Sequence, residues 1–171
     1  LDRFLLPESR VLDSCAGAGA YAFYLAGKGH MVSAGDVVPY NVKLIRQKQK
    51  GASPLERVYQ GDARDLTSFK EASFDAVLCM GARYHLHESA DRERAVAESL
   101  RVLKTGGLLF ASYLNRHGVI LQNVKGRLDN LEEILDFAGH GREGVFYAST
   151  PEETEALMDA HGLEKAAHLS L

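Results

Sequence analysis

Residues 13–19 carry the group of side chains in this sequence that is best suited to ligand chemistry. An acid follows an apolar pair and precedes two glycines: Val11, Leu12, Asp13, Ser14, Cys15, Ala16, Gly17, Ala18 and Gly19. An apolar run, a glycine loop and a helical segment together indicate the place where an α/β sheet holds a nucleotide-like ligand. An ionised carboxylate there would repel a diphosphate but attract an ammonium and a sulfonium. Asp13 before the glycines therefore favours a cationic adenosyl ligand.

Acids also stand where two later apolar runs end. Asp36 offers two oxygens to the paired hydroxyls of a ribose, and Val37 beside it offers an apolar surface to a purine. Asp62, followed by Ala63, is an acceptor for an exocyclic amine such as that of adenine. Each acid has an alternative interpretation, because Asp36 could be a solvated turn residue and Asp62 could cap a short helix. Their recurrence at successive strand ends favours a shared cofactor site that includes Ala63.

The glycines and main-chain carbonyls complete this predicted site. Gly17 and Gly19 permit close approach to the backbone, and the helix after them presents free N–H groups to a carboxylate. Cys15 lies in the same loop. Met80 and Gly81, at the end of a fourth apolar run, would offer backbone carbonyls to an ammonium group. The predicted ligand is therefore an amino acid joined to adenosine.

The elements that must position these residues alternate between apolar runs and helical patterns. This alternation predicts an α/β fold, a doubly wound, mostly parallel sheet flanked by helices. Strands are expected over residues 10–14, 30–36, 55–60, 74–80, 108–113 and 163–171. Helices are expected over residues 20–27, 39–50, 89–103 (capped by Ser89), a segment with Leu128, Leu131 and Leu135, and 151–162 (with a capping box at Thr150). A turn is expected at residues 104–107, and ligands are expected beyond the carboxyl ends of the strands.

The composition is that of an ordinary globular domain. The 171 residues are 46% hydrophobic and 25% charged, which predicts one domain over residues 1–171. A formal net charge of −3 gives no reason to expect nucleic acid, and no apolar run reaches the ~20 residues of a membrane span. Two cysteines without a spacing motif indicate a reducing compartment, so a cytoplasmic location is expected. The sequence begins at Leu1 rather than methionine, so we expect it to be truncated at its ends.

Together these motifs resemble the class I S-adenosylmethionine-dependent methyltransferases. The resemblance covers roughly residues 10–168 and rests on the acid and glycine loop, Asp36, Gly61-Asp62-Ala63, Phe74-Asp75-Ala76-Val77, and the segments 81–86 and 100–109. The last two are similar to a bacterial, small-molecule-type subgroup with a Gly-Pro-Leu-Tyr-His-Leu segment and a Leu-Lys-Pro-Gly-Gly turn. The resemblance implies a Rossmann-like fold and S-adenosyl-L-methionine as cofactor, with S-adenosyl-L-homocysteine as product. It also implies methyl transfer to a small-molecule acceptor.

Several positions depart from the pattern of that family. Cys15 stands in place of the first loop glycine, Ala82 and Arg83 replace Pro-Leu, and Thr105 replaces the proline of the turn. We expect the chain to lack the family's final antiparallel strand and the helices that precede its first strand. The resemblance therefore implies a cofactor site that is uncovered in this chain.

Catalysis by such a site depends on alignment more than on acid–base chemistry. A sulfonium methyl is already activated, so a general base is needed only when the acceptor must lose a proton. Tyr84 and His85 are the candidate catalytic residues because the family places groups near the methyl after its fourth strand; the alternative is that they only pack locally. Residues 113–146 are the expected substrate wall. Their basic side chains either attract an anionic substrate or form a solvated face: Arg116, His117, Arg127, His140 and Arg142. No metal is expected, because the seven histidines lack ligand spacing.

Other functions stay open from the sequence. An NAD(P)-dependent oxidoreductase fits Gly17-x-Gly19-x-x-Ala22 but not the acid at position 13, and the only Tyr-x-x-x-Lys pair, Tyr24 and Lys28, falls on the first helix. A non-catalytic methyltransferase-like binding module and an aminopropyl transferase are further alternatives. The methyl acceptor, the accepting atom and the oligomeric state are not determined by the sequence.

Overall fold

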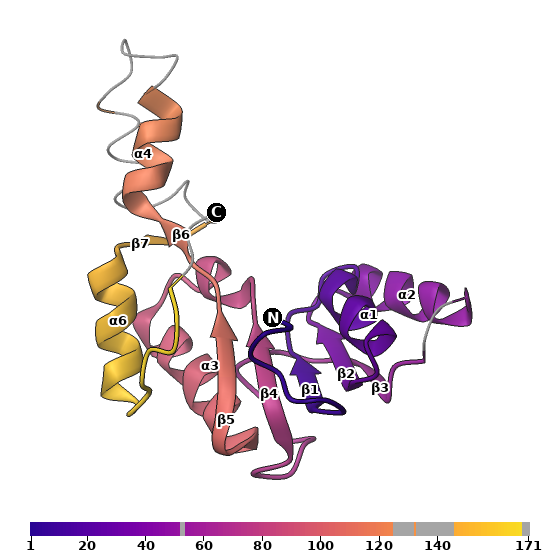
Figure 1. Ribbon diagram of the computed structural model, residues 1–171. Helices are drawn as coiled ribbons and strands as arrows, with labels where there is room; N and C mark the ends of the chain where they lie inside the picture. Colours follow the sequence, from indigo (N-terminus) through magenta and orange to yellow (C-terminus); the bar gives the residue numbers. More distant parts are fainter. Residues whose placement is uncertain (52–53, 125–131, 133–145, 169–171) are drawn as a thin grey trace.

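A parallel β-sheet forms the centre of the computed structural model, which describes residues 1–51, 54–124, 132 and 146–168 (Figure 1). Its five strands lie in the order β3-β2-β1-β4-β5. Their bounds are β1 Arg10–Asp13, β2 Met31–Asp36, β3 Arg57–Gln60, β4 Phe74–Cys79 and β5 Leu103–Ala111. The strand order reverses between β1 and β4, where open α/β sheets hold their ligands. The predicted doubly wound parallel sheet is confirmed.

Helices cover both faces of this sheet because its strands are apolar on both sides. Val11 of β1 packs with α1 (Ala20–Gly27) and α2 (Pro39–Lys48). The next residue, Leu12, points to the opposite face, into the cluster that contains Val102 of α3 (Ser89–Val102). Alternating side chains of one strand thus fill two separate cores, as the continuous apolar runs predicted.

The junction of α3 and β5 differs from the sequence prediction. The strand begins at Leu103, directly after the helix, and not at residue 108. Leu103 pairs with Phe74, and Leu108 pairs with Ala76, so the expected turn at residues 104–107 forms an irregularity inside the strand. The α3 cap is also corrected, because Glu88 occupies the N-cap position without a side-chain bond to the helix, and the Ser89 hydroxyl donates instead to the Glu93 carboxylate.

Beyond the carboxyl end of β5 the chain forms a small C-terminal layer, whose last helix turns back to the level of β4 and β5 in Figure 1. Its described residues form a two-stranded parallel sheet and two helices: β6 Leu114–Asn115, β7 Ala148–Ser149, α4 Arg116–Val124 and α6 Pro151–Ala160. In Figure 1, α4 projects away from the main sheet. Short 3₁₀ turns, η1 (Gln49–Gly51) and η2 (Ala82–His85), follow α2 and β4.

Predictions for this C-terminal layer had mixed outcomes. The capping box of α6 is confirmed, with the Glu153 N–H donating to the Thr150 hydroxyl and the Thr150 N–H donating to the Glu153 carboxylate. The expected strand over residues 163–171 is wrong for residues 163–168, which form no regular element, and residues 169–171 lie outside the described part. Leu128, Leu131 and Leu135 also lie outside it. None of the helices in the described ranges combines the length and apolar character that crossing a bilayer demands.

Candidate active site

Asp13 ends β1 at the reversal of strand order, and its carboxyl group is buried. Only 1% of the residue is exposed, and the backbone N–H of Cys15 donates to the carboxyl group. Oδ2 is also buried and has no hydrogen-bond partner among the described residues. Burial, with a smaller contribution from nearby Asp36, raises the pKa of Asp13 to about 7. The first strand end therefore holds an acceptor that a cationic group could pair with.

The glycine loop is held against the end of β2 by main-chain contacts. The Ala16 N–H donates to the Gly35 carbonyl at 2.9 Å, and the Gly17 N–H donates to the Asp36 carboxylate at 2.8 Å. Gly17 has a φ of +53°, and a Cβ placed there would meet nothing within 4 Å. Gly19 also has a positive φ, but Phe23 and other side chains fill the space beside it. A ligand could therefore approach the backbone closely at Gly17, whereas Gly19 is needed for the turn and for packing against Phe23.

Asp36 is the hub of these contacts. Its Oδ1 accepts from the Val38 N–H at 2.9 Å and from Asn41 Nδ2 at 3.1 Å, and its Oδ2 accepts from Gly17. A carboxylate has about four acceptor positions, so Oδ2 keeps capacity for one further donor. The neighbouring Val37 is 59% exposed and presents an apolar surface beside this carboxylate.

Asp62 has a partner that the sequence analysis missed. Arg64 donates to both of its carboxylate oxygens, and it also bonds Asp91 at 2.6 Å. Arg64 lowers the pKa of Asp62. A ligand amine that binds Asp62 would therefore have to share its carboxylate with Arg64. Ala63 is buried and packs with Cys79.

The end of β4 comes close to the glycine loop. Gly81 has a φ of +132°, and a Cβ placed there would lie 3.4 Å from the Tyr84 hydroxyl oxygen and 4.0 Å from Cys15 Cβ. Tyr84 thus lies beside the loop, whereas the rings of Tyr84 and His85 both pack against Phe146. Met80 is half-buried against the core on the α1 side of the sheet.

The two cysteines meet at this point because β1 and β4 are neighbours in the sheet. Cys15 and Cys79 are free thiols that hydrogen-bond to each other. This contact raises the pKa of Cys15 and lowers that of Cys79. Among the described residues, no cluster of three or more histidine, cysteine or acidic side chains is placed to hold a metal ion.

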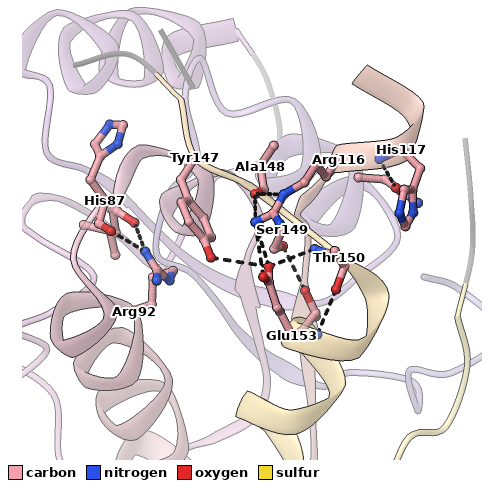
Figure 2. Close-up of polar contacts among 12 residues, drawn as sticks. His87, Arg92, Arg116, His117, Tyr147, Ala148, Ser149, Thr150 and Glu153 are labelled. Atoms are coloured by element: carbon pink, nitrogen blue, oxygen red, sulfur yellow. Dashed lines mark hydrogen bonds and ion pairs between the residues drawn. The ribbon is translucent and has the colours of Figure 1, made fainter. Parts of the chain in front are cut away.

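A network of charged and aromatic side chains, which the sequence analysis did not predict, joins residues 86–87, α3 and the C-terminal layer (Figure 2). Arg116 donates to the Ala148 carbonyl and to the Glu153 carboxylate, and Tyr147 also reaches Glu153. Arg92 lies 3.8 Å from the centre of the Tyr147 ring. Arg116 was expected in the substrate wall, but here it fastens β7 to α6; Arg127, His140 and Arg142 lie outside the described residues.

These features define a class before any relative is considered. A parallel sheet with a buried acid and a glycine loop at its order reversal is a Rossmann-like binding domain for an adenosyl-type ligand. A family model described as a methyltransferase domain matches residues 12–111, which is more than half of the chain. The chain belongs to the class I S-adenosylmethionine-dependent methyltransferases, whose cofactor is S-adenosylmethionine and whose product is S-adenosylhomocysteine.

Individual relatives agree with this assignment. A ubiquinone biosynthesis O-methyltransferase from Xanthomonas campestris pv. campestris (strain B100) is 37% identical over 114 residues, 67% of this chain and 46% of that protein. A glycine/sarcosine N-methyltransferase from Parasynechococcus marenigrum (strain WH8102) is 33% identical over 106 residues, 61% of this chain and 38% of that protein. The chain therefore spans less than half the length of these two curated relatives. A methyltransferase structure from Methanosarcina mazei matches in fold, with a TM-score of 0.76 at 21% identity, covering 93% of this chain and 81% of that one.

Proposed function

We propose that this chain transfers a methyl group from S-adenosylmethionine to a small-molecule acceptor by direct in-line displacement. The observation that carries the proposal is the buried Oδ2 of Asp13, which lacks a partner among the described residues and lies at the reversal of strand order. A cationic amino acid group would satisfy this atom, whereas a phosphate would be repelled by it. The residues present therefore fit the family's cofactor.

The chain's own residues would bind and orient the cofactor. Asp13 and the carbonyls of Met80 and Gly81 would accept hydrogen bonds from the ammonium group. The unfilled surface at Gly17 would leave room for the part of the ligand that lies against the backbone. Asp36 would use its remaining acceptor position for the ribose. The predicted adenine contacts are Val37, Asp62 and Ala63, and Cys15 and Gly19 complete the loop. When bound, the cofactor supplies an electrophilic sulfonium methyl.

Tyr84 and His85 are the residues we propose for the acceptor side of the reaction. The Tyr84 hydroxyl lies beside Gly81 and Cys15, and its main-chain carbonyl accepts from the Tyr147 N–H at 2.7 Å, which fixes the turn. The ring of His85 has a nitrogen that can act as a general base toward an acceptor that must lose a proton. Displacement on a sulfonium needs this help only when the acceptor carries such a proton.

The acceptor is left at the level of a small molecule. The two relatives are named as an O- and an N-methyltransferase, so their names do not decide the accepting atom of this chain. We further propose that residues 1–171 act as one domain, in the cytoplasm and without a nucleic-acid partner. The family match favours neither an oxidoreductase nor a binding module.

Release of S-adenosylhomocysteine in the presence of pools of small molecules tests the proposal. We expect release above background with at least one pool. Asp36→Ala should lower the affinity for S-adenosylhomocysteine by about 5-fold or more, because the one ribose hydrogen bond that Asp36 can still accept, worth ~1 kcal/mol, is lost. Arg46→Leu, on the exposed side of α2, is the control. Absence of both turnover and cofactor binding by calorimetry would refute the proposal; an unchanged affinity of the Asp36 variant would mean that the ribose lies elsewhere.

A further inference from the structure

Arg83 is a buried charge that the proposed reaction has not yet used. It lies in η2, directly after β4, and only 3% of the residue is exposed. Its Nε and Nη1 atoms are buried and have no hydrogen-bond partner among the described residues. A guanidinium is charged at every physiological pH and offers five donors, so two buried empty donors are unfavourable.

The side chains around Arg83 do not supply a counter-charge. Those that act on it most strongly are the Cys79 thiol, the Tyr113 and Tyr147 hydroxyls, and Arg92, a second cation. Glu153, the acid drawn near Tyr147 in Figure 2, is already bound by Arg116 and the Thr150 N–H. Two arginines and two tyrosines therefore lie near one another, and among the described residues that act on Arg83 there is no acid to balance its charge.

An apolar side chain of similar size would fill this position without the cost of an unpaired buried charge. Arginine at such a place is the residue type that binds carboxylate and phosphate groups through paired N–H donors. The burial and the empty donors together indicate that the missing partner is an anion from outside the described residues.

The location of Arg83 separates this anion from the proposed cofactor site. Tyr113 follows β5, and Arg92 and Tyr147 belong to α3 and the approach to β7, so the surroundings of Arg83 lie on the β4–β5 side of the order reversal. Asp36 and Val37, proposed for the ribose and the purine, lie at β2 on the other side. Gly81, between β4 and η2, lies close to both the Tyr84 hydroxyl and Cys15 of the glycine loop, so the two sides meet there.

We propose that Arg83 binds an anionic oxygen group, a carboxylate or a phosphate, on the methyl acceptor. This inference rests on the proposed methyl transfer, since it names the chemical class of the acceptor. The guanidinium would hold the acceptor by that group and leave its nucleophilic atom at the turn that contains Tyr84.

The test uses calorimetry on the full chain saturated with S-adenosylhomocysteine, with benzoate and inorganic phosphate as anionic probes and benzamide as the neutral match of benzoate. We expect at least one of the two anions to bind. If benzoate binds, benzamide should bind at least 10-fold more weakly than benzoate. Arg83→Leu should weaken the bound anion by at least 10-fold, Arg83→Lys should weaken it less, and Arg46→Leu should not change it. The affinity for S-adenosylhomocysteine should stay within 2-fold in all variants.

Several outcomes would overturn the inference. These are failure of both anions to bind the wild-type chain, equal binding of benzoate and benzamide with no phosphate binding, or equal anion affinity in Arg83→Leu. If Arg83→Leu weakens S-adenosylhomocysteine but not methylthioadenosine, the anion is the cofactor's own carboxylate. An ultraviolet thiolate absorbance that disappears in Cys79→Ser would show that the Cys79 thiolate is the counter-ion of Arg83. Failure of the wild-type chain to bind S-adenosylhomocysteine would instead refute the proposed function itself.

Discussion

The two sides of the order reversal carry buried charges of opposite sign. On the β1–β3 side, Asp13 and Asp36 are buried carboxyl groups, and Asp36 is held by N–H donors from the loop and from the start of α2. On the β4–β5 side, Arg83 is a buried guanidinium whose Nε and Nη1 lack partners among the described residues. The same sheet edge is therefore prepared for a cation on one side and an anion on the other, which suits a reaction between two different ligands.

The two sides also differ in how far their contacts reach along the chain. Gly17 meets Asp36 over 19 residues, a stretch that holds only α1 and β2. Arg116 meets Glu153 over 37 residues, and the Tyr147 N–H donates to the Tyr84 carbonyl across a stretch that includes α3, β5 and α4. The first side is a compact unit of neighbouring strands, whereas the second depends on segments that are distant in sequence.

The largest effect that we predict concerns the charge of Asp13. Its folded pKa of about 7 lies above the ordinary value of 3.8, so the folded chain holds this proton more tightly than the unfolded chain. The resulting stabilisation is fully present below about pH 4 and is lost as the pH rises to about 7. The loss amounts to about 4 kcal/mol. Asp13→Asn, which cannot titrate, should lack this part of the pH dependence.

Urea unfolding of the wild type and of Asp13→Asn across this pH range measures the effect. The difference between their unfolding free energies should change by about 4 kcal/mol from pH 4 to pH 7. Saturating S-adenosylhomocysteine should reduce the change, because an ammonium beside Asp13 favours the ionised form. Asp159→Asn, at an exposed acid of α6, is the control. A difference that is constant with pH would remove the electrostatic basis of the comparison.

The contrast between the two sides explains what the sequence could predict. Asp13, Gly17 and Asp36 are found at strand ends, and parallel strands bring their carboxyl ends together, so local pattern was enough to group them.

Long-range contacts on the second side left no such pattern. Arg83 was visible only as a departure from a family segment, and nothing in its neighbours in sequence indicates burial beside Tyr113 and Tyr147. The strands β6 and β7 have two residues each, too few for a period to show, and they pair across a long connection. The Asp62–Arg64 ion pair was missed because an arginine on a turn is ordinarily solvated. The additional bond from Arg64 to Asp91, a residue distant in sequence, could not be read from the local pattern.

A second prediction compares glycines on the two sides. A Cβ at Gly35 of β2 would lie 2.3 Å from the Tyr59 ring, which is packed against Phe69. Gly35→Ala should therefore lower the unfolding free energy by about 2 kcal/mol. Among the described residues, a Cβ at Gly118 of α4 would meet Asn115 alone, at 3.8 Å, so Gly118→Ala should stabilise the chain by up to ~1 kcal/mol through helix propensity. Urea unfolding measures both. Equal changes in unfolding free energy for the two variants would mean that β2 is not packed more closely than α4.

The smallest predicted effect tests whether the two sides are independent. Thr150→Ala removes the hydroxyl that accepts from the Glu153 N–H, which should cost about 1 kcal/mol. Glu153 keeps its bonds to Arg116 and Tyr147, so the loss should appear as faster amide hydrogen exchange in the first turn of α6 rather than as global unfolding. Thr150→Ser, which keeps the hydroxyl, should exchange like the wild type. The affinity for S-adenosylhomocysteine should not change, because every proposed cofactor contact lies in residues 13–81. A several-fold loss of affinity in Thr150→Ala alone would show that the C-terminal layer supports the cofactor site, and the two sides would then have to be treated as one.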